Sequence, residues 1–122
     1  MTIREAIDTA DRLKPNAYSE EDKLRWLSEL DNIVYTEIIR SHEGGQEAEF
    51  DGYKAGTKWD TVLLIPEPYC ECYLYYIFAK IDLLNGEYSA YNNRLASFDS
   101  IYKAFAAEYT RTHMPLSRPV IF

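Results

Sequence analysis

The length of 122 residues fits a single domain, and a composition with 47% hydrophobic and 27% charged residues is typical of a globular protein. A chain of this size can bury enough surface to fold without a disulfide or a structural metal. The formal net charge of −7 argues against a protein that reads nucleic acid or binds an anionic membrane surface, because both partners require a basic patch.

No apolar run is long enough to cross a membrane, and the first residues lack the layout of a signal peptide. We therefore expect the chain to stay in the cytoplasm, where thiols stay reduced.

The N-terminus predicts a short amphipathic helix. Thr2 and Glu5 have the spacing of a capping box. Apolar residues then recur at helical spacing up to Leu13, and Lys14-Pro15-Asn16 ends the helix because the residue before a proline avoids helical dihedrals.

A longer second helix is predicted from Ser19 to about Ser41. Ser19 is the N-cap, and three acidic residues in the first turn complement the helix dipole. The helix has an apolar stripe and stops before Gly44-Gly45; the stripe consists of Leu24, Leu27, Leu30, Val34 and Ile38.

The middle of the chain predicts a small β-hairpin. Glu47–Phe50 alternates polar and apolar residues, and Val62–Ile65 is a β-branched, apolar run that ends at a proline. Between them, residues 51–60 form a loop in which Tyr53 and Trp59 are candidates for exposed aromatic anchors.

The stretch from Pro66 to His113 predicts an antiparallel pair of helices. The first runs from about Tyr69 to Leu84, and Asn85-Gly86 stops it because glycine takes left-handed dihedrals at little cost. The second ends at Met114-Pro115 and has heptad spacing along one face, so that Leu95 and Phe98 are expected to be buried against the first helix. The heptad positions are Tyr88, Tyr91, Leu95, Phe98, Tyr102, Phe105 and Tyr109.

The last seven residues, 116–122, are predicted to form an extended tail on a body of residues 1–115. Arg111 to Phe122 contains two arginines and no acid, so it is suited to the acidic face of a neighbouring copy. The tail could add as a strand to a sheet edge on another molecule, fold back over its own core, or stay disordered in the free subunit. The residues predicted to bind partners are Tyr53, Trp59, Arg111, Arg118, Val120, Ile121 and Phe122.

We expect no catalytic, cofactor or metal site. Cys70 and Cys72 point to opposite sides of a predicted helix, so they cannot form a disulfide, and we expect one to be buried and the other half-exposed. No second cysteine pair completes a zinc site.

The remaining candidates for chemistry have simpler structural interpretations. His42 and His113 are each expected at a helix C-terminus, where an imidazole complements the dipole. Glu47 and Glu49 could form a carboxylate pair but fit a solvated strand face better. Gly44-Gly45 lacks the lysine of a phosphate-binding loop.

Several short motifs resemble one family along nearly the whole chain. They are Leu13-Lys14-Pro15-Asn16, Tyr18 to Lys23, Trp26-Leu27, His42 to Gly45, Phe50 to Tyr53, Asn85 to Tyr88, Tyr91-Asn92-Asn93 and Thr110 to Pro115. The chain resembles head–tail connector, or head-completion, proteins of long-tailed phages and prophages of Gram-positive bacteria. The resemblance implies a mostly helical subunit without an active site, which forms a ring with its own copies between portal and tail.

The sequence therefore predicts a mainly α domain of four helices, with a C-terminal helix hairpin and a small β-hairpin between helices 2 and 3. The expected function is that of a structural virion protein, not an enzyme, found in the virion and, during assembly, in the host cytoplasm. The alternative is an acidic regulatory or inhibitor protein that mimics nucleic acid. The uneven charge, −6 over residues 1–61 and −1 over residues 62–122, favours this alternative, and the aromatic richness and the basic tail weaken it.

Overall fold

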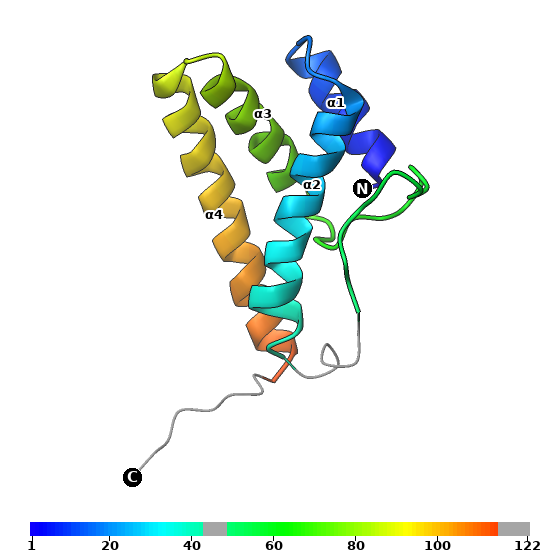
Figure 1. The fold of residues 1–122 in the computed structure, drawn as a ribbon. Helices are drawn as coiled ribbons and strands as arrows, with labels where there is room; N and C mark the ends of the chain where they lie inside the picture. The colour runs from blue at the N-terminus through cyan, green and yellow to red at the C-terminus, as the bar shows by residue number, and fades with distance from the viewer. Residues whose placement is uncertain (43–48, 115–122) are drawn as a thin grey trace.

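The computed structural model describes residues 1–42 and 49–114, which form four α-helices and one π-helical turn. The elements are α1 (Ile3–Leu13), α2 (Glu20–Val34), the π-helical turn η1 (Tyr35–Ile39), α3 (Cys72–Leu84) and α4 (Tyr88–Thr112). The four α-helices run alternately up and down, with α1 and α3 beside the upper part of the longer α2–η1 and α4 (Figure 1). The prediction of a mainly helical fold with four helices is confirmed.

The first two helices begin where their capping residues predict. The Thr2 hydroxyl accepts a hydrogen bond from the Glu5 backbone N–H at 3.1 Å, and the Glu5 carboxylate accepts one from the Thr2 N–H. Ser19 caps α2 by accepting from the Asp22 N–H at 3.1 Å. Each cap pairs backbone donors that the first helical turn leaves without a partner.

The second helix continues almost as far as predicted, but its last part changes its hydrogen-bond pattern. From Tyr35 to Ile39 the backbone is π-helical, and the Arg40 N–H donates to the Tyr35 carbonyl at 2.8 Å. This part packs on the second half of α4: the Tyr102 hydroxyl donates to Glu37 at 2.9 Å, and His42 Nε2 lies 3.2 Å from Thr110 Oγ1.

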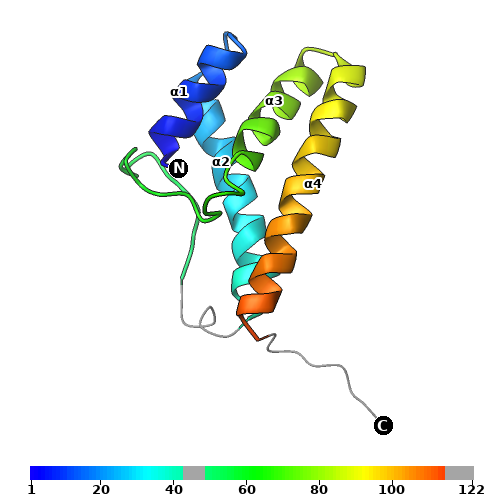
Figure 2. The same cartoon turned by 180° about the vertical axis from the view of Figure 1, so that it is seen from behind.

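Helices α3 and α4 form the predicted antiparallel hairpin, which both views show side by side (Figure 2). Gly86 joins them at a φ of +77°, as expected for a glycine that stops a helix. Phe98 and Phe105 are buried and Leu95 is half-buried, whereas Tyr88 is 65% exposed. The heptad face is therefore buried along its middle, but not at Tyr88, which follows directly on the hairpin turn.

Helix α3 begins at Cys72, so the prediction of a start at Tyr69 is wrong by three residues. The residues before it form tight turns, in which the Tyr69 N–H donates to the Pro66 carbonyl at 2.9 Å and the Cys72 N–H to the Tyr69 carbonyl at 3.2 Å. Proline at position 68 cannot donate a backbone hydrogen bond, which favours turns over a regular helix there.

The predicted β-hairpin is wrong: the described residues contain no strand. Val62 forms a single antiparallel bridge with Thr2 and is exposed. The Leu63 N–H donates to the Met1 carbonyl at 2.9 Å, and the Ile3 N–H donates to the Thr61 carbonyl at 3.0 Å. The run with strand-like composition therefore pairs with the N-terminus. Of its predicted partner, Glu47 and Ala48 lie outside the described residues.

The core joins all four helices and the segment that precedes α3. The side chains that are fully or almost fully buried include Ile3, Ile7, Leu27, Leu30, Val34, Ile65, Tyr73, Ile77 and Ile81. Ile65 comes from the irregular segment and is as buried as any helical residue, so this segment is a part of the core rather than a surface loop.

Candidate functional site

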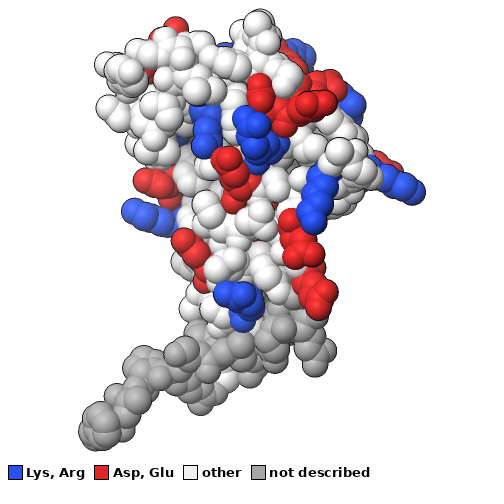
Figure 3. Space-filling model, viewed as in Figure 1, with Lys and Arg blue, Asp and Glu red and all other residues white. Residues whose placement is uncertain are grey.

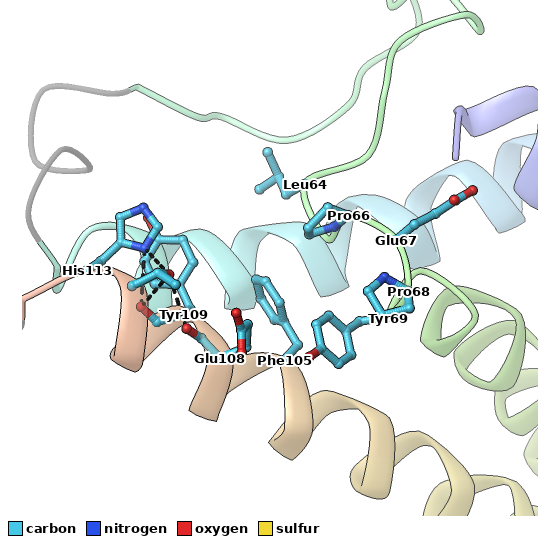
Figure 4. A pocket seen from close by; sticks show the side chains of 10 residues that line it. Leu64, Pro66, Glu67, Pro68, Tyr69, Phe105, Glu108, Tyr109 and His113 are labelled. Atoms are coloured by element: carbon cyan, nitrogen blue, oxygen red, sulfur yellow. Dashed lines mark hydrogen bonds between the residues drawn. The ribbon is translucent and has the colours of Figure 1, made fainter.

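A groove of about 450 Å³ lies beside the last turns of α4 (Figure 4). One wall is the turn segment before α3, and the other is the C-terminal part of α4 with its cap residue. The lining residues are Leu64, Pro66, Glu67, Pro68, Tyr69, Phe105, Glu108, Tyr109, Thr112 and His113. We call this the α4 groove.

Aromatic rings make up much of the surface of the α4 groove. The rings of Tyr69 and Phe105 lie with their centroids 6.0 Å apart, across the two walls. Tyr109 and His113 stack in parallel at 3.8 Å, and His113 Nδ1 lies 3.2 Å from the Tyr109 carbonyl oxygen. Burial raises the pKa of Tyr109, so its phenol stays protonated at neutral pH.

The rim of the α4 groove is acidic. Glu67 is exposed and forms no ion pair with a residue that the structure describes. Glu108 pairs with Arg111, which is itself exposed. The Glu67 side chain points away from the rings, so its carboxylate lies at the outer edge of the α4 groove (Figure 4). Rings and prolines beside carboxylates suit an extended peptide that carries apolar and basic side chains.

A buried carboxylate holds the wall of the α4 groove that precedes α3. Asp31, on α2, is fully buried and accepts hydrogen bonds from the Leu64 N–H at 3.1 Å, from the Tyr73 hydroxyl at 2.6 Å and from the Tyr53 hydroxyl. The Tyr73 hydroxyl also accepts from the Ile65 N–H at 2.7 Å. Asp31 therefore fixes the path of the chain into Pro66.

Burial shifts the pKa values of this cluster upward. It raises the pKa of Asp31 above its ordinary value, although the hydrogen bonds from Tyr53, Tyr73 and Leu64 act in the opposite direction. Burial, and then the nearby charge of Asp31, raise the pKa of both phenols. Sequence analysis did not single out Asp31. The signal was present, because Asp31 lies four residues after Leu27 and three before Val34, within the apolar stripe of α2.

The two predicted aromatic anchors of the loop face the protein rather than solvent. Tyr53 is buried, contrary to its expected exposure, and its hydroxyl is bound to Asp31. Trp59 is half-buried, and the Arg4 guanidinium lies 4.1 Å from its ring centroid. Their role in partner binding stays a prediction, and the structure explains both as groups that hold the loop on α1 and α2.

The predicted sites near the C-terminus are described only in part. Arg111 is exposed at the end of α4, within reach of Glu108. Arg118, Val120, Ile121 and Phe122 lie outside the described residues. The strand-addition hypothesis also required a hairpin edge, which the described part of the chain does not provide.

Both cysteines are buried, so the expectation of one half-exposed thiol is wrong. Burial raises the pKa of Cys70 and of Cys72, which keeps both as neutral thiols. Cys70 lies in the turn before α3 rather than on the helix, which explains why the helical argument for opposite directions did not describe it. Both behave as small apolar side chains of the core.

The histidines end helical segments, as predicted. His42 follows η1, is buried, and meets the ring of Tyr109 edge-on at 5.2 Å, while His113 is the cap of α4. Tyr109 thus has a histidine on either side. Of the carboxylate pair considered from the sequence, Glu49 is exposed and Glu47 lies outside the described residues.

The opposite end of α4 has a second apolar surface. Leu83 is 40% exposed, Leu84 57% and Tyr88 65%, and all three lie at the turn of the α3–α4 hairpin. We call these three residues the tip surface. It and the α4 groove are separated by most of the length of a 25-residue helix.

Charged side chains of both signs are interspersed on the face shown in Figure 3. Ion pairs join several charged side chains of the molecule, such as Arg4 with Glu20 at 3.0 Å and Lys80 with Glu29 at 3.1 Å. The described residues contain no group of three His, Cys, Asp or Glu side chains placed to bind a metal ion. None of the described helices has the length and apolar character required to cross a membrane.

The chain matches no protein-family model, no curated protein and no solved structure. Its function is therefore inferred from its own residues and their arrangement.

Proposed function

We infer that the chain is a structural virion subunit: a head–tail connector or head-completion protein of a long-tailed phage or prophage, which forms a ring with its own copies and joins portal to tail. It acts in the virion and is made in the host cytoplasm during assembly. The observation that carries this proposal is the presence of two different apolar surfaces, the α4 groove and the tip surface, at opposite ends of one long helix.

Two unlike surfaces suit an assembly in which each copy contacts the next through different patches. Contacts of that kind close into a ring when the rotation between copies allows it. The tip surface exposes three large apolar side chains at one turn, and exposed apolar side chains that gather at one place mark candidate interaction sites. The choice of a connector protein is motivated by the short motifs of the sequence, from Leu13-Lys14-Pro15-Asn16 to Thr110–Pro115.

The arrangement of charges gives less support to mimicry of nucleic acid. A mimic requires acidic side chains in a continuous row to resemble successive phosphates. On the face in Figure 3, lysine and arginine side chains interrupt the acidic ones. Ion pairs such as Arg4–Glu20 also neutralise acidic side chains of the molecule.

The proposal is tested by native mass spectrometry of the full chain, alone and mixed with the portal protein of the phage or prophage that the proposal implies. We expect a ring with one defined number of subunits that binds the portal. A chain that stays monomeric at high concentration and does not bind the portal contradicts the proposal.

A matched pair of variants tests the tip surface. Tyr88→Glu places a charge on that surface, and as the first residue of α4 it is favourable to the helix dipole, so folding is preserved. We expect Tyr88→Glu to weaken assembly. Ala104→Glu, at an exposed position on the same helix, is the control and should assemble as the wild type does.

A further inference from the structure

We propose that the α4 groove binds the segment Pro115–Phe122 of a neighbouring copy of the chain. The inference rests on the proposed assembly function for the presence of a neighbour, and it identifies the contact through which copies are joined. It replaces the sheet edge expected from the sequence with a groove between a turn segment and a helix.

The chemistry of the groove defines what it can bind. Tyr69, Phe105 and Tyr109 offer ring surface, and Pro66 and Pro68 form an apolar edge opposite the helix. Grooves lined by aromatic side chains bind extended, proline-containing segments, because such segments lose little conformational entropy on docking. Its carboxylates come from Glu67 and Glu108.

The sequence of the segment has the complementary chemistry. Residues 115–122 are Pro-Leu-Ser-Arg-Pro-Val-Ile-Phe, with four large apolar side chains, two prolines, one arginine and no acid. In extended form eight residues span about 26 Å, enough to place Arg118 at one rim while the apolar residues after it reach the rings. Glu67 is exposed and has no ion-pair partner among the described residues, so it is available to Arg118.

The end of α4 favours a neighbouring copy over the chain's own segment. Thr112 and His113 already line the groove, and its rings lie back along α4, at Phe105 and Tyr109. His113 is extended, with φ −134° and ψ 130°, the chain bends at this residue, and Pro115 favours an extended Met114. To reach the rings of its own groove the segment would have to run back along α4 directly after Pro115, a constraint that does not apply to the segment of a neighbouring copy.

The first experiment measures binding in the full chain. A variant with Val120→Asp and Phe122→Asp keeps every described residue and removes the apolar ends of the segment. We add a synthetic peptide of residues 115–122 and follow backbone amide signals by NMR. We expect saturable shifts at Tyr69 and at Glu108 to His113. Shifts that are absent from these residues, or equal for a peptide of the same composition in scrambled order, overturn the proposal.

The second experiment tests the charge match by sedimentation of full-length variants. Glu67→Lys and Arg118→Glu should each raise the self-dissociation constant by roughly fivefold, the scale of an exposed ion pair. Their combination should restore the constant to within about twofold of the wild type, since the pair is re-formed with reversed signs. Asp99→Lys, an exposed acid on α4, is the control for net charge and should change the constant little. A double variant as weak as the single ones overturns the pairing.

The same sedimentation data show whether the α4 groove binds the segment of a neighbouring copy or the segment of its own chain. A wild-type chain that stays monomeric, while its tail variant binds the peptide, means that the segment occupies its own groove, and the neighbour is then excluded. Failure of the proposed phage function is distinguishable: a chain that assembles through this groove but ignores the portal contradicts the connector function alone. If the wild-type chain forms rings that bind the portal, and the variant with Val120→Asp and Phe122→Asp forms them equally well, the connector function stands and only the inference about the groove is contradicted.

Discussion

Asp31 shows how one buried side chain can determine the shape of a surface 33 residues later in the chain. Its carboxylate accepts a backbone hydrogen bond from Leu64 and phenol hydrogen bonds from Tyr53 and Tyr73, and it thereby attaches the loop, the turn segment and α3 to α2. All three partners are donors, so a carboxylate, which has only acceptors, satisfies them together.

Asp31→Asn should lower the free energy of unfolding by about 1–3 kcal/mol at neutral pH, because the amide introduces donors where Leu64 and the two phenols also donate. Urea unfolding measures the change. The control is Asp99→Asn, because Asp99 is an exposed acid. Asp82→Asn would not serve as a control, because Asp82 pairs with cations. A loss no larger than that of Asp99→Asn would contradict the role assigned to Asp31.

The same variant gives a prediction for pH. Burial raises the folded-state pKa of Asp31 above 3.8, its ordinary value, so the folded state binds the proton more tightly than the unfolded state. The stabilisation from this protonation is complete below the unfolded pKa and is lost as the pH rises through the folded pKa. The stability of the wild type relative to Asp31→Asn should therefore increase on acidification from neutral pH toward 4. A difference that shrinks on acidification contradicts the direction of the shift.

Gly52 has a backbone conformation and a position that both require glycine. Its φ is +87°, and a Cβ there would collide with the Ser28 hydroxyl and lie 2.9 Å from Asn32 Nδ2. Gly52→Ala should cost about 1–3 kcal/mol, because left-handed strain and steric overlap add. Gly56→Ala is the matched control in the same loop, since a Cβ at that position meets nothing within 4 Å. Equal denaturant midpoints for the two variants would contradict this account.

At the scale of elements, α4 is divided into regions with different partners. Its middle packs on α3, where the ring centroids of Phe98 and Tyr76 lie 5.5 Å apart. Phe98 also stacks on Tyr102 of α4 itself. Its C-terminal turns contact His42, which follows η1, and line the α4 groove. Its first residue, Tyr88, belongs to the tip surface. A regular heptad pattern extends over all three regions, so spacing alone does not distinguish buried rings from exposed ones.

Phe98→Ala should reduce the free energy of unfolding by about 3–5 kcal/mol, because it removes a buried ring and leaves a cavity between α3 and α4. Tyr88→Ala, at the exposed position of the same heptad pattern, should change it by less than about 0.5 kcal/mol. Thermal or urea unfolding of the two proteins under the same conditions makes the comparison. A loss below 1 kcal/mol for Phe98→Ala would show that the helix pair is not packed through this residue.

At the scale of the whole molecule, a buried charge joins three helices near the hairpin turn. Asp82 on α3 is fully buried. Its carboxylate oxygens lie 2.9 Å from Nζ of Lys14, at the end of α1, and 3.6 Å from Nε of Arg94, on α4. Its oxygens receive no well-directed hydrogen bond from the described residues, so the two cations hold the carboxylate mainly through charge.

Lys14→Ala should destabilise the protein by about 3 kcal/mol, because it leaves the buried Asp82 carboxylate with its more distant cation alone. Arg94→Ala should cost less, since the closer Lys14 contact is kept. Denaturant unfolding of both variants measures the order. Equal losses, or a larger loss for Arg94→Ala, would mean that Asp82 is held in another way.

The sequence by itself determined the local features of this protein. Thr2 with Glu5 and Ser19 set the starts of α1 and α2, and Gly86 set the turn between α3 and α4, because caps and left-handed glycines act within a few residues of the backbone that they satisfy. Apolar periodicity likewise predicted Phe98 in the core.

Tertiary structure decided what the segment before α3 would become. Its composition favoured a strand, but its backbone donors bind Met1, Asp31 and Tyr73, partners that lie from 8 to about 60 residues away and that no local pattern specifies. The α4 groove has the same origin, because its walls come from residues 64–69 and 105–113. Such a surface exists only after the chain has folded, since the residues that form it are brought together by packing rather than by spacing.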